Sequence, residues 1–197
     1  MREDWLLISP CVVLAFIEIK YIWRSLPEYF EKDTEISGGY SWMDDFKYFY
    51  FMYAAEAVFI IQWACNIFPI AGSLTQIYLR LLGYGLVTLG FLIALISLKK
   101  LGSNWSGMTD FRIKKNQVLV KDGIYALVRH PIYLAVQLEI LGYELVVNSW
   151  LVVPVMLVVF WYIGRHIGKE DLLLEKKFGD EFRKYRSRVS RILPWIY

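Results

Sequence analysis

Two short segments of the sequence carry the residues best suited to chemistry. Arg129-His130 stands directly before Pro131, and Arg165-His166 stands shortly before the acidic pair Glu170-Asp171. Proline suits the first turn of a helix. We therefore expect Arg129-His130 at a helix N-terminus, where free backbone N–H groups favour a carboxylate or a phosphate. Ionisable groups that gather in one cleft indicate a catalytic or ligand-binding pocket.

Several other kinds of site are excluded because their motifs are missing. The chain has two histidines and no HExxH spacing, so a metal centre fits poorly. It has no GxSxG for a serine nucleophile, and neither GxGxxG nor a Walker motif for a soluble-type nucleotide fold. Cys11 and Cys65 lie inside apolar runs and are expected to be buried packing residues.

The elements that position these residues are expected to lie in a membrane. Hydrophobic residues make up 57% of the 197-residue chain, above the ~45–50% of soluble domains, which excludes a disordered, collagen-like or small disulfide-rich chain. The excess is concentrated in runs that match or approach the ~20 residues of a membrane-spanning helix. The five runs are Trp5–Trp23, Tyr48–Ile70, Ile77–Leu98, Pro131–Val147 and Trp150–Gly164.

The distribution of positive charge predicts how these spans are oriented. Three Lys or Arg lie within 24–47, seven within 99–129 and nine from residue 165 onward, so 19 of 22 fall on one side if there are five spans. Positive loops stay in the cytoplasm. We therefore expect the N-terminus outside and the basic segments inside. From Glu170 onward, apolar and basic positions alternate at helical spacing, which predicts an amphipathic C-terminal helix on the membrane surface.

The polar motifs, taken together, resemble the signature of the isoprenylcysteine carboxyl methyltransferases. Gly123-Ile124-Tyr125 is followed, after four residues, by His130-Pro131-Ile132-Tyr133. The match continues with Glu170-Asp171 and with Phe178-Gly179-Asp180-Glu181-Phe182, and it begins upstream at Gly102-Ser103-Asn104-Trp105. It covers about residues 99–194, whereas the N-terminal half matches in hydropathy only.

The resemblance implies an integral membrane enzyme that transfers a methyl group from S-adenosylmethionine to the carboxylate of a prenylated cysteine, leaving S-adenosylhomocysteine. Together with the hydropathy pattern, which predicts three transmembrane helices in residues 1–98, it predicts an all-α fold. Residues 99–197 would form the catalytic half, with a cytoplasmic cofactor-binding loop, a helix-turn-helix membrane pair and the C-terminal helix. By motif, the cofactor would contact Gln117, Val118, Leu119, Val120, Tyr125, His130, Pro131, Ile132, Tyr133 and Glu170.

One departure from the family pattern affects the substrate site. The family has an arginine four residues before the glutamate matched by Glu170, and here that position is His166, with Arg165 beside it. The expected catalytic set is Glu170 with Arg165 or His166, either of which could hold the substrate carboxylate. A carboxylate is already ionised at neutral pH, so the reaction needs alignment and water exclusion more than a strong base.

Three alternatives remain open at the level of sequence. The acceptor could be another lipid-soluble molecule such as an aminophospholipid, whose amine would need a base such as Glu170 or His166. A membrane reductase that uses NADPH would need a site for the 2′-phosphate and is usually longer. A non-catalytic membrane scaffold would leave the residues around His130 and Glu170 unexplained.

Overall fold

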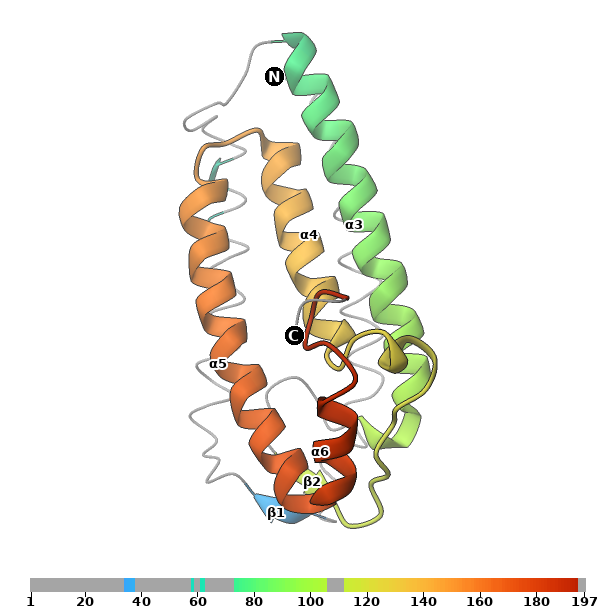
Figure 1. Cartoon of the computed structure of the whole chain (residues 1–197). Coiled ribbons are helices and arrows are strands. Elements are labelled where there is room, and N and C mark those ends of the chain that lie inside the picture. The colour runs from blue at the N-terminus through green and yellow to red at the C-terminus, as the bar shows by residue number, and fades with distance from the viewer. Residues whose placement is uncertain (1–33, 38–57, 59–60, 63–72, 106–111, 195–197) are drawn as a thin grey trace.

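Three long helices form the body of the part of the chain that the structure describes. The structure, a computed structural model, describes residues 34–37, 58, 61–62, 73–105 and 112–194 (Figure 1). Helices α3 (Ser73–Leu101), α4 (Pro131–Val147) and α5 (Val152–Phe178) correspond to three of the predicted spans. The other two predicted spans, Trp5–Trp23 and Tyr48–Ile70, lie almost entirely outside the described residues, so the total of five spans stays a prediction.

Helices α3 and α4 touch backbone to backbone. A Cβ atom built on Gly83 would lie 2.6 Å from the carbonyl oxygen of Gly142, and one built on Gly142 would lie 2.6 Å from the carbonyl oxygen of Gly83. A Cβ atom built on Gly90 would lie 2.7 Å from the side chain of Glu139. Small residues permit this approach, as is common for helices in lipid. Gly83 and Gly90 of α3, with Gly142 of α4, therefore permit the close contact between the two helices.

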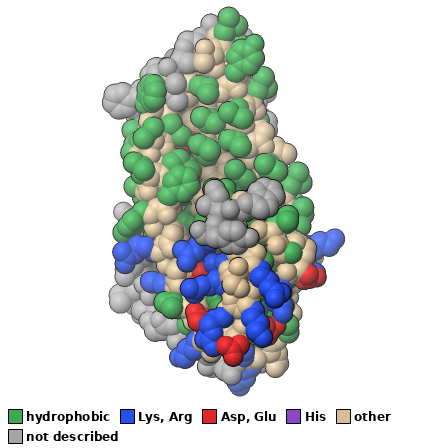
Figure 2. All heavy atoms as spheres, viewed as in Figure 1, with side chains coloured by type: hydrophobic (Ala, Val, Ile, Leu, Met, Phe, Trp, Pro, Cys, Tyr) green, Lys and Arg blue, Asp and Glu red, His purple; other side chains and the backbone are tan. Residues whose placement is uncertain are grey.

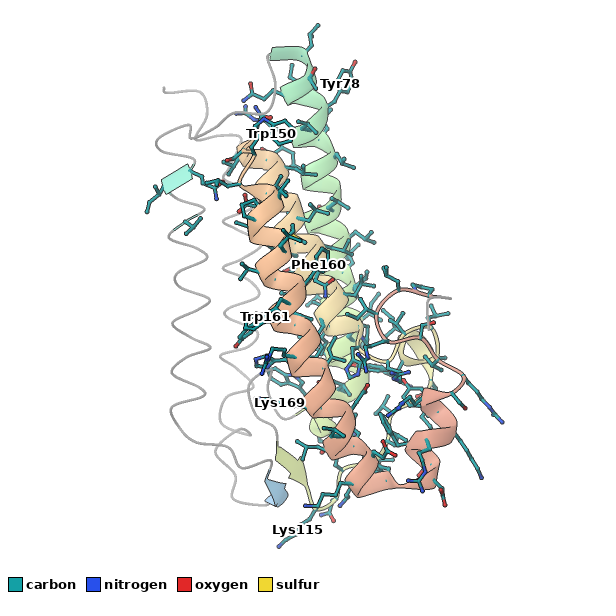
Figure 3. All side chains as sticks on the ribbon, turned by 60° about the vertical axis from the view of Figure 1, so that its left-hand side comes forward. Tyr78, Lys115, Trp150, Phe160, Trp161 and Lys169 are labelled. Atoms are coloured by element: carbon teal, nitrogen blue, oxygen red, sulfur yellow. The ribbon has the colours of Figure 1, made fainter. Side chains whose placement is uncertain are left out.

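The upper part of the molecule exposes an apolar surface. Figure 2 shows hydrophobic side chains covering this part, and charged side chains gathered at the lower end. On α3 and α5 the exposed residues include Leu81, Leu92, Leu157 and Phe160. Tyr78 and Trp150 lie near the same end of the bundle (Figure 3), as aromatic residues do at a membrane interface.

Two helical segments of the described part are long and apolar enough to cross a membrane, Leu74–Asn104 and Val152–Phe178. Helix α4 has 17 residues, which corresponds to about 26 Å at ~1.5 Å per residue. It ends at Asn148, whose left-handed backbone (φ 62°) caps the helix and begins the turn into α5. The predicted helix-turn-helix pair is therefore present in the fold.

Two expectations about secondary structure were wrong. The amphipathic C-terminal helix does not begin as a separate element near Glu170, because α5 continues unbroken to Phe178. The break comes at Gly179, whose positive φ of 51° ends α5 and starts the short helix α6 (Asp180–Arg186). The fold is also not purely helical, since β1 (Thr34–Ser37) pairs antiparallel with β2 (Arg112–Lys114).

The lower end of the bundle is closed by polar connections. Two 3₁₀ turns, η1 (Gly102–Asn104) and η2 (Gly123–Ala126), flank the loop between α3 and α4. Helix α6 folds back beside this loop (Figure 1). Leu119 from the loop packs in one buried cluster with Phe182, Tyr185 and Val189. This cluster fixes the loop against α6, and a pocket lies beside it.

Candidate active site

A pocket lies between the α3–α4 loop, the start of α4, α5 and α6. Its empty volume is about 740 Å³, including the part open to solvent. All ten residues predicted from the motif to contact the cofactor line it. The remaining lining residues are Leu101, Asn104, Trp105, Arg129, Leu174, Phe182 and Tyr185.

The α3–α4 loop, which forms one wall of the pocket, is held by hydrogen bonds between side chains and its backbone. The Asn104 side-chain oxygen accepts a hydrogen bond from the Val118 N–H at 2.8 Å. On the opposite side, the Tyr185 hydroxyl donates to the Tyr125 carbonyl at 2.6 Å. These two bonds connect the end of α3 and helix α6 to the same loop. Asn104 lies in the Gly102–Trp105 motif, but the motifs predicted no specific role for Asn104 or Tyr185.

The Tyr125 side chain reaches the pocket from η2 and is 6% exposed. Its buried hydroxyl has no hydrogen-bond partner among the described residues. Burial, reinforced by the negative charge of Glu170, raises the pKa of this hydroxyl well above its usual range. Tyr125 is therefore a neutral donor that can bind a polar atom of a ligand.

His130 lies between two carboxylates of α5. Its Nε2 is 2.8 Å from Asp171 Oδ1, and its Nδ1 is 3.6 Å from Glu170 Oε2. Burial disfavours the charged imidazole, but the Glu170 charge and the hydrogen bond to Asp171 outweigh it and raise the pKa of His130 to about 9. The predicted proximity of His130 to the acidic pair is present, and the imidazole is a cation at neutral pH.

Asp171, the second member of the acidic pair, was given no separate role in the sequence analysis. Its side chain is 4% exposed, and it contacts Arg129 Nη2 at 3.3 Å and Arg191 Nη2 at 3.2 Å as well as His130. Asp171 does not line the pocket, because it faces Arg129 and the segment after α6. Its adjacency to Glu170 and the spacing of Arg129 were visible in the sequence, whereas Arg191 stood among many surface arginines.

Arg165 and His166 are not among the described residues that line the pocket. The Arg165 guanidinium carbon lies 5.2 Å from the centre of the Trp161 ring, and Trp161 projects from the side of α5 away from α6 (Figure 3). The His166 ring centre is 4.2 Å from that of Tyr162. His166 is four positions before Glu170 in the chain, so the two lie on nearly the same face of α5, about 40° apart. Arg165 is about 140° away from Glu170.

The described residues contain no group of three or more His, Cys, Asp and Glu side chains placed to hold a metal ion. Within this part of the chain, the pocket combines one partly exposed carboxylate, a buried imidazolium and aromatic and aliphatic walls. Such a lining suits an organic ligand that carries both an apolar ring system and charged groups.

Comparison with known families identifies the class of protein. The family model described as phospholipid methyltransferase matches residues 78–181, a span that contains most of the pocket. The chain belongs to this family. Its matched region runs from the first turns of α3 to the start of α6.

Individual relatives agree with this family and with the motif resemblance. Protein-S-isoprenylcysteine O-methyltransferase of Schizosaccharomyces pombe is 29% identical over 57% of this chain and 48% of its own length. Its namesake from Saccharomyces cerevisiae is also 29% identical, over 63% of this chain and 52% of its own. Methanethiol S-methyltransferase 1 of Bradyrhizobium diazoefficiens is 32% identical over 36% of this chain and 25% of its own. The chain thus spans about half the length of the isoprenylcysteine relatives it matches.

A solved structure shares the fold. A eukaryotic intramembrane Ras methyltransferase, isoprenylcysteine carboxyl methyltransferase, superposes with a TM-score of 0.60. The match covers 76% of this chain and 53% of the other, at 22% sequence identity. The all-α membrane fold expected from the sequence is therefore confirmed in its mostly helical architecture, with the short β1–β2 pair as the exception. The resemblance to the isoprenylcysteine carboxyl methyltransferases is likewise confirmed by the relatives and by this structure.

Proposed function

We propose that this protein transfers a methyl group from S-adenosylmethionine to the terminal carboxylate of a prenylated cysteine and forms a methyl ester. The observation that carries the proposal is that ten residues, chosen from sequence motifs alone, line one pocket. The names of the isoprenylcysteine relatives support the choice of acceptor.

The pocket fits S-adenosylmethionine, which supplies an electrophilic methyl group on a sulfonium when bound. The Glu170 carboxylate can complement a positive charge on the ligand, and His130 presents Nδ1 beside it. The Tyr125 hydroxyl, which has no hydrogen-bond partner among the described residues, can donate to an acceptor atom of the ligand. With a ligand bound, the apolar walls formed by Leu101, Trp105 and their neighbours would shield these electrostatic contacts from water and so strengthen them.

His166 is the better placed of the two residues proposed to hold the substrate carboxylate. It shares a face of α5 with Glu170, one turn along the helix, whereas Arg165 stacks on Trp161 on another face. A substrate held by His166 would lie next to the Glu170 side of the pocket. An acceptor with a lipid tail would then enter from the bilayer, between helices.

The proposal includes an orientation in the membrane. The charged lower end, which contains the pocket, would be cytoplasmic, and the turn at Asn148 would face the opposite side. The concentration of Lys and Arg in residues 99–129 and from 165 onward supports this orientation.

A methyl-transfer assay with labelled S-adenosylmethionine tests the function. Full-length protein in vesicles is given a prenylcysteine mimic, an aminophospholipid, a small thiol or no acceptor. We expect a base-labile methyl ester on the prenylcysteine mimic and background label elsewhere. Label on the aminophospholipid or the thiol alone would overturn the proposed acceptor.

The aminophospholipid is kept as a second candidate because the family model that matches residues 78–181 carries the phospholipid name. An amine acceptor is protonated at neutral pH and needs a base, unlike a carboxylate. The two candidates therefore predict different pH dependence. Transfer to an amine should rise steeply above pH 7, and transfer to a carboxylate should not.

A further inference from the structure

The buried carboxylate of Asp171 joins three parts of the chain that are far apart in the sequence. It receives the Arg129 guanidinium from the turn before α4, the His130 imidazole, and the Arg191 guanidinium from the segment after α6. A buried charge is stable only when it is paired and hydrogen-bonded. Asp171 therefore fixes the relative positions of α5, the start of α4 and the segment that contains Arg191.

That last segment, residues 186–191, is also bound to the same turn through the backbone. The N–H of Arg129 donates to the Ser190 carbonyl at 2.8 Å, and the N–H of His130 donates to the Arg191 carbonyl at 3.0 Å. Arg129 Nη1 donates to the carbonyls of Arg186 and Val189. We call residues 186–191 the C-terminal clasp. It follows directly on Tyr185, whose side chain lines the pocket and binds the Tyr125 carbonyl.

The His130 ring lies between two carboxylates: Nε2 is hydrogen-bonded to Asp171 Oδ1 at 2.8 Å, and Nδ1 faces Glu170 Oε2 at an ion-pair distance of 3.6 Å. Charged and titratable groups face this cluster from every side. Glu170 and Asp171 belong to α5, and Arg129 directly precedes His130 in the chain. Tyr133 of α4 has its ring centre 5.8 Å from that of the imidazole, and Arg191 and Tyr185 approach from the clasp and α6. A doubly protonated imidazole presents an N–H group toward each of these carboxylates.

We propose that Asp171 is a positioning residue, which holds His130 as an imidazolium with Nδ1–H turned toward Glu170 and anchors the C-terminal clasp that supports the pocket wall. The proposal rests on the proposed function for the nature of the ligand. The coupling between Asp171, His130 and the clasp is a property of the chain itself.

The protonation of His130 gives a direct test. The chain has two histidines, so ¹⁵N-histidine NMR of the full chain shows two imidazoles, and His166→Gln assigns them. We expect His130 in wild type to carry protons on both ring nitrogens at pH 7.5. In Asp171→Asn the titration midpoint should fall by at least ~1 pH unit, since an opposite charge has been removed. Asp180→Asn, which removes an exposed carboxylate of α6, should leave it unchanged.

The clasp has a separate readout. Arg191→Gln removes one donor to Asp171 and leaves the bond between Asp171 and His130 in place. We expect faster hydrogen exchange at the amides of Arg129 and His130, with His130 still protonated. Arg188→Gln, an exposed neighbour, is the matched control. If Asp171→Asn fails to fold, Arg191→Gln alone tests the proposal.

Ligand affinity completes the experiment. S-adenosylhomocysteine should bind Asp171→Asn and Arg191→Gln roughly 2- to 30-fold more weakly than wild type, the range seen for residues without ligand contact. An unchanged His130 titration in folded Asp171→Asn would overturn the proposal, as would unchanged exchange in Arg191→Gln. If both changes occur but wild type binds no S-adenosylhomocysteine, the role of Asp171 stands and the proposed function is wrong.

Discussion

At the scale of single residues, Glu170 is the side chain whose charge matters most for the proposed reaction. It is the one carboxylate among the described lining residues. Glu170→Gln keeps the shape and removes the charge. We expect turnover of the prenylcysteine mimic to fall at least ~10-fold, which corresponds to ~1.4 kcal/mol of transition-state stabilisation.

The matched control for that variant is Glu181→Gln. Glu181 pairs with Lys121 at the surface, where ion pairs contribute little, so its turnover should match wild type. Equal turnover in Glu170→Gln and wild type would remove Glu170 from the mechanism.

His130 makes the stability of the protein depend on pH. Its pKa is about 9 in the folded chain and ~6.5 in an unfolded chain. The folded state therefore binds the proton more tightly. This stabilisation is complete below about pH 6.5 and is lost as the pH rises through 9. It contributes up to ~3 kcal/mol to the free energy of unfolding. Thermal melts between pH 6 and 9.5 should show the decline in wild type and a flatter profile in His130→Gln. A profile in His130→Gln as steep as that of wild type would contradict the assignment.

At the scale of elements, the α3–α4 contact leaves no room for added atoms. Gly142→Ala places a methyl group against the Gly83 carbonyl oxygen, which belongs to a helix backbone and cannot turn aside. We expect a loss of about 1–3 kcal/mol of unfolding free energy, as for other overpacked sites, measured by denaturation in detergent.

Gly85→Ala on α3 is the internal comparison. Nothing lies within 4 Å of a β-carbon at this position, and alanine favours a helix over glycine by up to ~1 kcal/mol. Its stability should therefore equal or exceed that of wild type. If both variants were equally destabilised, the cause would be general glycine loss and not the α3–α4 contact.

Much of the helical arrangement could be predicted because it depends on composition. The bounds of α4 follow from Pro131 at its start and Asn148 at its end, and both residues act locally. The continuation of α5 to Phe178 was missed, because Glu170 and Lys176 look like a surface helix when the membrane boundary is assumed to end the span. The pairing of β1 with β2 depends on residues far apart in the chain, and hydropathy carries no signal for it.

The site divides in the same way. The ten lining residues could be predicted because nine of them lie between Gln117 and Tyr133 and the tenth is Glu170, in a part of the chain that matches a family. Asp171 and Arg191 could not be assigned roles, because their contacts depend on how the chain folds back after Gly179. The proposed places of Arg165 and His166 depended on which face of α5 meets the pocket, and this is a matter of tertiary packing.

At the scale of the whole molecule, the proposed topology has a simple test. Cysteines introduced at Ser73 and Ser187 lie at the first residue of α3 and just after α6. With the pocket end in the cytoplasm, a membrane-impermeant reagent should label them from opposite sides of sealed vesicles. Labelling of both from one side would contradict the orientation.

The C-terminal clasp also sets the order in which the protein is completed. Residues 186–191 supply the carbonyls that receive the N–H groups of Arg129 and His130, and they are translated after every described membrane helix. A nascent chain halted after α5 would have α3, α4 and α5 available for insertion but would lack the clasp and the α6 side of the pocket. The proposed methyl transfer would therefore begin only once this late segment has left the ribosome and folded back onto helices already in the bilayer.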